Sequence, residues 1–190
     1  MQREQRRRER RTSILLWSIG GLVLLLIAGS LAAIIIVDRR NTPDLSAVQS
    51  FEQSQGHVTG PVTYNTNPPA GGQHNPVWLN CGIYDEPVTN ENAVHSQEHG
   101  AVWVTYRPDL PADQVTALKR QLDDTYLILS PYPDLPAPVV VSAWGKQLRL
   151  DGADDERLGA FIREYRLSQN APESGATCAG GTGTPSSGAS

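Results

Sequence analysis

The longest apolar stretch of the chain lies near its N-terminus, where residues 14–37 form 24 consecutive positions without a charge. As a helix rising about 1.5 Å per residue, this run would extend roughly 36 Å, enough to cross a hydrocarbon core about 30 Å thick. A cleaved signal peptide has an apolar region of only about 7–15 residues, followed by a small-residue cleavage site. The pattern therefore predicts an uncleaved transmembrane helix over residues 14–37.

Beyond residue 100, the pattern of apolar and polar positions becomes regular. Runs rich in β-branched and aromatic residues predict strands at residues 101–106, 126–130, 138–144 and 147–150. Apolar residues at helical spacing predict helices at residues 111–123 and 154–167. Residues 60–93 are rich in Pro and Gly, which leaves room only for short strands and turns. We expect an α+β domain: a small, largely antiparallel sheet with two helices on one face, preceded by one N-terminal transmembrane helix.

Charge divides the chain into two unequal parts. Residues 1–40 hold eight of the 16 Lys and Arg and three of the 20 Asp and Glu, a net charge of +5, whereas residues 41–190 have a net charge of -9. Positively charged flanks of a membrane helix remain in the cytoplasm. We therefore expect a plasma-membrane protein with a cytoplasmic N-terminus and an extracytoplasmic C-terminal domain. The acidic outer part lacks the clustered Lys and Arg of a nucleic-acid-binding surface, so we expect no nucleic-acid partner. The sequence does not identify a protein partner.

These patterns divide the chain into five segments. They are a cytoplasmic Arg-rich segment (residues 1–13), a transmembrane helix (14–37), a stalk (38–56), an extracytoplasmic domain (57–178) and a Gly/Ser/Thr tail (179–190). The tail has no charge and too few apolar residues to offset its chain entropy, so we expect it to be disordered.

Two cysteines, Cys81 and Cys178, fall in the outer part, where disulfides persist. A bond between them would close a loop of about 97 residues and would stabilise the fold by on the order of 4–5 kcal/mol. A disulfide is the favoured interpretation. The alternative is that Cys81 is a thiolate metal ligand.

All four histidines, His57, His74, His95 and His99, lie within a 43-residue window. The string His-Ser-Gln-Glu-His at 95–99 would place two imidazoles on one helix face, as zinc ligation requires, with Glu98 free to act as a base. The following Gly and strand pattern limit this helix to one or two turns.

A loop that ends in His74 could add a third nitrogen ligand to His95 and His99. Glu98 could be a base, a carboxylate that orients an imidazole, or an acceptor for backbone N–H groups. No paired acidic motif is obvious further along the chain, although Glu156, Glu164 and Glu173 are available.

Several blocks, taken in order, resemble the bacterial domain-of-unknown-function family 3105 over about residues 57–178. They are VTY at 62–64, PPAGGQH at 68–74, WLNCGIY at 78–84, PV at 87–88, HSQEHGAV at 95–102, AWG at 143–145 and APE at 171–173. The resemblance implies a single-span protein with an exported domain, and it implies no particular activity. Residues 70–73 depart from the family, which tends to have a Thr-Ser-Gly-Pro-like run there.

Three functions remain open from the sequence. The leading hypothesis is an anchored extracytoplasmic module that binds copper or zinc through His74, His95 and His99, with Glu98 beside them. The second is a metal-dependent hydrolase with Glu98 as the base, and the third is a structural or partner-binding domain of the cell envelope. Copper ligation by thioethers is disfavoured because the only methionine is Met1.

Overall fold

A computed structural model describes the chain at residues 21, 24–31, 33, 43–122 and 125–186. The predicted Arg-rich segment, most of the predicted membrane span at 14–37 and the first residues of the stalk lie outside the described residues, although residues 24–31 are helical. Within the described residues, we find no helix that is both long and apolar enough to cross a membrane. Residues 43–190 form a compact unit by themselves, and this unit is described below.

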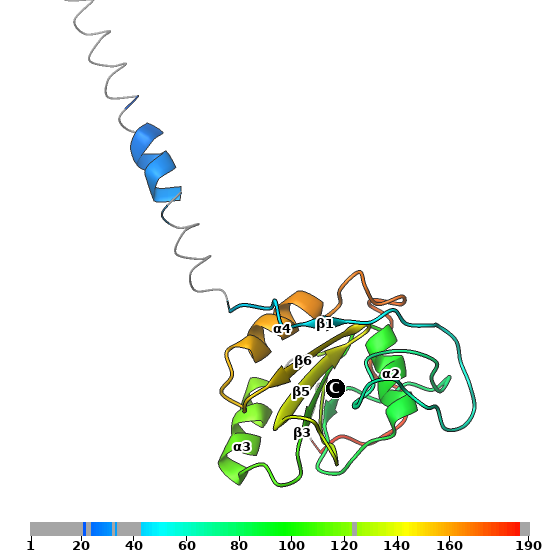
Figure 1. The fold of residues 1–190 in the computed structure, drawn as a ribbon. Helices are drawn as coiled ribbons and strands as arrows, with labels where there is room; N and C mark the ends of the chain where they lie inside the picture. Colours follow the sequence, from blue (N-terminus) through cyan, green and yellow to red (C-terminus); the bar gives the residue numbers. More distant parts are fainter. Residues whose placement is uncertain (1–20, 22–23, 32, 34–42, 123–124, 187–190) are drawn as a thin grey trace, which may run out of the picture. The chain divides into compact units, whose positions relative to one another are not determined.

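The described part of this unit is built on a six-stranded sheet, β1-β6-β5-β3-β4-β2 (Figure 1). Its strands are β1 (Gln49–Ser50), β2 (Gly82–Ile83), β3 (Val102–Tyr106), β4 (Leu127–Pro131), β5 (Val139–Ala143) and β6 (Lys146–Leu150). The predicted strands after residue 100 are present to within one or two residues at each end.

The sheet is mixed, so the expectation of a largely antiparallel sheet holds only in part: of the described strand pairings, three are antiparallel, including β1 with β6, and two are parallel. Strand β3 pairs antiparallel with β5, and β5 with β6, but β4 runs parallel to both β3 and β2. Helix α3 (Ala112–Gln121) connects β3 to β4. Because such a crossover returns the chain to the same end of the sheet, the two strands must be parallel.

The two predicted helices, α3 and α4 (Arg157–Tyr165), pack on one face of the sheet, as expected (Figure 1). Their apolar stripes meet the alternate side chains of the strands in one core cluster. This cluster includes Leu118 of α3, Leu158 and Phe161 of α4, and Val104 and Val141 of the sheet, all of them fully buried.

A third helix, α2 (Asn90–Glu98), lies on the opposite face (Figure 1). Ala93 of this helix packs with Trp103 and Ile128, the strand residues that point away from the first core. Because both faces of β3 are covered, all five of its residues are buried, as is usual for strands that pair in parallel. The sequence predicted only one or two turns here, whereas α2 has nine residues.

The start of the C-terminal tail is ordered against the domain, which differs from the expectation of disorder from residue 179. The backbone N–H of Asn80 donates to Thr182 (2.8 Å), and that of Thr182 donates to Trp78 (2.9 Å). Further along, the N–H of Ser186 donates to Ile83 (2.7 Å). Backbone pairing, which needs no apolar side chains, therefore fixes residues 179–186, and residues 187–190 lie outside the described residues.

Candidate metal centre

The C-terminal end of α2 presents two imidazoles on one face. His99 caps the helix in helical backbone geometry, so it stays in step with His95 one turn earlier. The two ring centroids are 4.6 Å apart. Gly100, at φ +99°, ends the helix where the backbone of Leu167 passes: a Cβ at this position would lie 3.0 Å from the Leu167 Cα.

His74 reaches the same region from the loop of residues 68–74. Two buried glutamine side chains hold this loop: Gln147 donates to the carbonyl of Pro68 (2.8 Å), and Gln97 donates to that of Pro69 (3.1 Å). His74 also forms an isolated parallel bridge with His57. The bridge places a fourth imidazole beside the other three.

Three of the imidazoles are oriented in the same way by the backbone. The Nδ1 atoms of His74, His95 and His99 each lie 2.7 Å from a carbonyl oxygen, of Gly72, Asn75 and Thr177 respectively. A carbonyl can only accept a hydrogen bond, so each Nδ1 carries the proton. In the neutral ring, Nε2 then carries a lone pair, and this is the arrangement in which histidines bind metals.

The Nε2 atoms point toward one another and toward two carboxylates. His95 Nε2 lies 3.0 Å from His99 Nε2, and His74 Nε2 lies 2.9 Å from Glu98 Oε2. The second contact lacks hydrogen-bond geometry, so Nε2 of the fully buried His74 has no hydrogen-bond partner. Lone pairs this close repel each other unless a cation, either a proton or a metal ion, lies between them.

Burial keeps the central imidazole neutral. The pKa of His95 is lowered to about 4: burial is the largest cause, the Asn75 carbonyl opposes it, and the neighbouring His99, His74 and His57 rings add smaller lowering effects. A neutral imidazole is the form that binds a metal ion.

Two groups of side chains have potential ligand atoms that all lie within 4.8 Å of one another. The four-donor set comprises His57, His74, His95 and Glu98. The three-donor set comprises His95, His99 and Glu173.

The predicted ligands His74, His95 and His99 are thus brought into one region, but they are divided between these two sets. His95 belongs to both sets, whereas His74 and His99 do not share one. Glu98, expected beside the ligands, has its carboxylate among the donors.

Sequence reasoning did not select His57 and Glu173 as ligands. His57 follows a polar stalk and carries no motif, so only its bridge with His74 reveals it. Glu173 was one of three acids available downstream, and its Oε2 lies 3.4 Å from His99 Nε2. It lies 74 positions further along the chain from His99, so no local spacing could have chosen it over Glu156 or Glu164.

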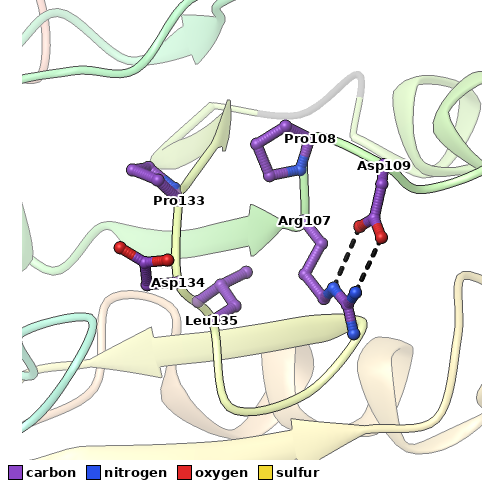
Figure 2. Close-up of a pocket in the computed structure, with 6 residues that line it drawn as sticks. All are labelled: Arg107, Pro108, Asp109, Pro133, Asp134 and Leu135. Carbon is purple, nitrogen blue, oxygen red and sulfur yellow. Dashed lines mark hydrogen bonds and ion pairs between the residues drawn. The ribbon is translucent and has the colours of Figure 1, made fainter.

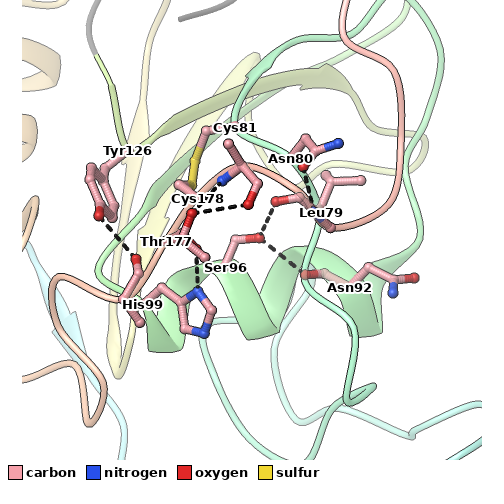
Figure 3. The surroundings of a disulfide bond; sticks show 12 residues. Leu79, Asn80, Cys81, Asn92, Ser96, His99, Tyr126, Thr177 and Cys178 are labelled. Carbon is pink, nitrogen blue, oxygen red and sulfur yellow. Dashed lines mark hydrogen bonds between the residues drawn. A yellow bond between two sulfur atoms is a disulfide. The ribbon is translucent and has the colours of Figure 1, made fainter. Parts of the chain in front are cut away.

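The disulfide adjoins this centre (Figure 3). Cys81 and Cys178 are bonded, as the sequence predicts, with their Cα atoms 5.4 Å apart. Thr177, whose carbonyl accepts the Nδ1–H of His99, immediately precedes Cys178. The cross-link therefore fixes the residue that orients one of the imidazoles, and its sulfurs are not available as thiolate ligands.

Within the described part of the chain, a surface pocket at the C-terminal end of β3 contains no comparable cluster of metal-binding side chains (Figure 2). It is lined by Arg107 to Asp109 and by Pro133 to Leu135. The guanidinium of Arg107 donates twice to the Asp109 carboxylate, at 2.9 and 2.7 Å. These bonds lower the pKa of Asp109 and satisfy the charge of the arginine within the pair. The histidine centre is therefore the better candidate for function.

A comparison with protein-family models matches residues 57–180 to the family described as protein of unknown function DUF3105. The match spans more than half of the 190 residues, and the chain belongs to this family. Searches among curated proteins and among solved structures gave no match.

Proposed function

We propose that this protein is a membrane-anchored extracytoplasmic domain that binds one transition metal ion, zinc or copper, in its histidine cluster. Residues 14–37 would be the anchor in the plasma membrane, with the Arg-rich segment in the cytoplasm. The disulfide supports an exported domain, because such bonds persist outside the cytoplasm.

One observation carries the metal proposal: imidazoles with a protonated Nδ1 direct their Nε2 lone pairs at one another and at carboxylates. Donors about 2.1 Å from a tetrahedral ion are separated by roughly 3.4 Å. The contacts within the two sets, at 2.9 and 3.9 Å in one and 3.0 and 3.4 Å in the other, bracket this separation. Imidazole and carboxylate donors suit Zn(II) and Cu(II).

The four-donor set is the better resting site for the ion. It supplies three imidazoles and one carboxylate, which complete a tetrahedral site without solvent. Glu98 then acts as a ligand, and this favours binding over the hydrolase alternative, in which its carboxylate would be free to take a proton from water.

The test is the metal content of the full chain, purified in detergent and loaded with Zn(II) or Cu(II), then freed of excess metal and measured by mass spectrometry. We expect one ion per chain in the parent and almost none in His95→Ala, because both sets depend on His95. Gln73→Ala, which changes the exposed neighbour of His74, is the matched control and should retain the ion. A parent chain that binds no metal would overturn the proposal.

A further inference from the structure

The proposed ion has two alternative positions, because His95 is common to both donor sets. Its Nδ1–H is engaged by the Asn75 carbonyl, which leaves one lone pair, on Nε2. One lone pair binds one metal ion at a time. The two sets therefore cannot both be filled, and an ion that keeps its bond to His95 can move from one to the other.

Each set has one solvent-exposed donor, and the sets differ in the charge of that donor and in the number of ligands the protein supplies. In the four-donor set the exposed donor is the imidazole of His57 (side chain 47% exposed), Glu98 and His74 are buried, and the protein supplies all four ligands. The three-donor set includes Glu173, whose carboxylate side chain is 53% exposed, and it leaves one tetrahedral position for water. A hydrated dication is attracted to an exposed carboxylate and can exchange its waters there one at a time.

Backbone hydrogen bonds hold Glu173 beside His99. The backbone N–H groups of Glu173 and Gly175 donate to the carbonyls of Glu98 and His99, both at 3.0 Å. These are carbonyls at the end of α2 that have no acceptor role within the helix. Two residues further on, the Thr177 carbonyl accepts the His99 Nδ1–H. Residues 173–177 are thus bonded to the helix end that carries the imidazoles.

We infer that His99 and Glu173 form a loading site, which takes a divalent metal ion from solvent and passes it to the four-donor set. This inference rests on the proposed function. In the transfer the bond from the ion to His95 Nε2 is kept. The bonds to His99 Nε2 and Glu173 break while those to His74 Nε2 and Glu98 form, and any remaining water is released as His57 binds. The ion keeps its oxidation state throughout.

The experiment follows Co(II) binding to the full chain in detergent by stopped-flow absorbance, because its visible bands report both the rate of binding and the final coordination. The test variant is Glu173→Gln. Glu164→Gln removes the same charge from an exposed position on α4 and is the matched control. We expect Glu173→Gln to slow binding by about tenfold, in line with the rate gained from a charged approach. The final spectrum and the stoichiometry of one ion should not change.

Each other result overturns the loading role in a recognisable way. If Glu173→Gln and Glu164→Gln bind Co(II) at the same rate, Glu173 contributes only general charge. If Glu173→Gln alters the final spectrum or lowers the stoichiometry, Glu173 is a ligand of the resting site. A parent chain that binds no Co(II) would count against the proposed function itself, and this outcome differs from both of the others.

Discussion

Removing the disulfide with the double variant Cys81→Ser, Cys178→Ser should lower the stability of residues 43–190 substantially. The bond joins residues 97 positions apart, so its absence frees a long loop in the unfolded chain. In the chain-entropy model a loop of this length corresponds to about 4–5 kcal/mol at 25 °C. The free energy of unfolding should fall by that amount, because the unfolded state gains entropy that the folded state does not.

The assay is equilibrium unfolding in urea, followed by the fluorescence of Trp78, Trp103 and Trp144. A chelator should be present, because any ion that binds only the folded state would add its own stabilisation. The parent treated with a reductant is the control: it should approach the double variant, which should itself be insensitive to the reductant. A loss of less than about 1 kcal/mol would refute the reasoning, since it would mean that the cross-link does not restrict the unfolded chain.

Two further predictions concern the backbone and the core. Gly100→Ala should destabilise the domain by about 1–3 kcal/mol, because φ +99° is strained for alanine and the new Cβ meets the backbone of Leu167. Gly159→Ala within α4 is its control and should stabilise by roughly 0.5–1 kcal/mol; equal effects of the two changes would contradict the argument. Phe161→Ala should cost about 3–5 kcal/mol in urea unfolding, because the ring is fully buried, whereas the exposed Val77→Ala should change little. A loss of less than about 1 kcal/mol at Phe161 would mean that the core of α3 and α4 does not hold the fold.

The sequence predicted the elements after residue 100 well because the buried strands are continuous apolar runs rich in β-branched residues and the helices carry apolar residues at helical spacing. In α4, Leu158, Phe161 and Ile162 recur at helical spacing and are buried, and polar residues occupy the other face. Local periodicity could not predict whether neighbouring strands run parallel or antiparallel. The parallel pairing of β3 with β4 follows from the helix between them, which is a property of the connection.

The length of helix α2 was underestimated because its sequence lacks the apolar periodicity that marks α4. Its last six residues are all buried, and four of them are polar: His95, Ser96, Gln97 and Glu98. The sequence therefore shows no contrast between an apolar buried face and a polar exposed face. Burial of His95, Ser96 and the Gln97 amide N–H is tolerable because backbone carbonyls elsewhere in the chain bond to them. Ser96 donates to the Leu79 carbonyl (2.7 Å), for example, and none of these partners can be recognised from local sequence.

The sequence by itself determined the charge asymmetry, the regular half of the domain, the cysteine pair and the placing of His95 and His99 on one helix face. These depend on composition or on short spacings along the chain. Only the tertiary structure decided which carboxylates meet which imidazoles, and that His95 is shared between two donor sets. Distances between donors such as His99 and Glu173 are set by the packing of segments far apart in sequence, because ligand geometry is a property of the fold around the ion.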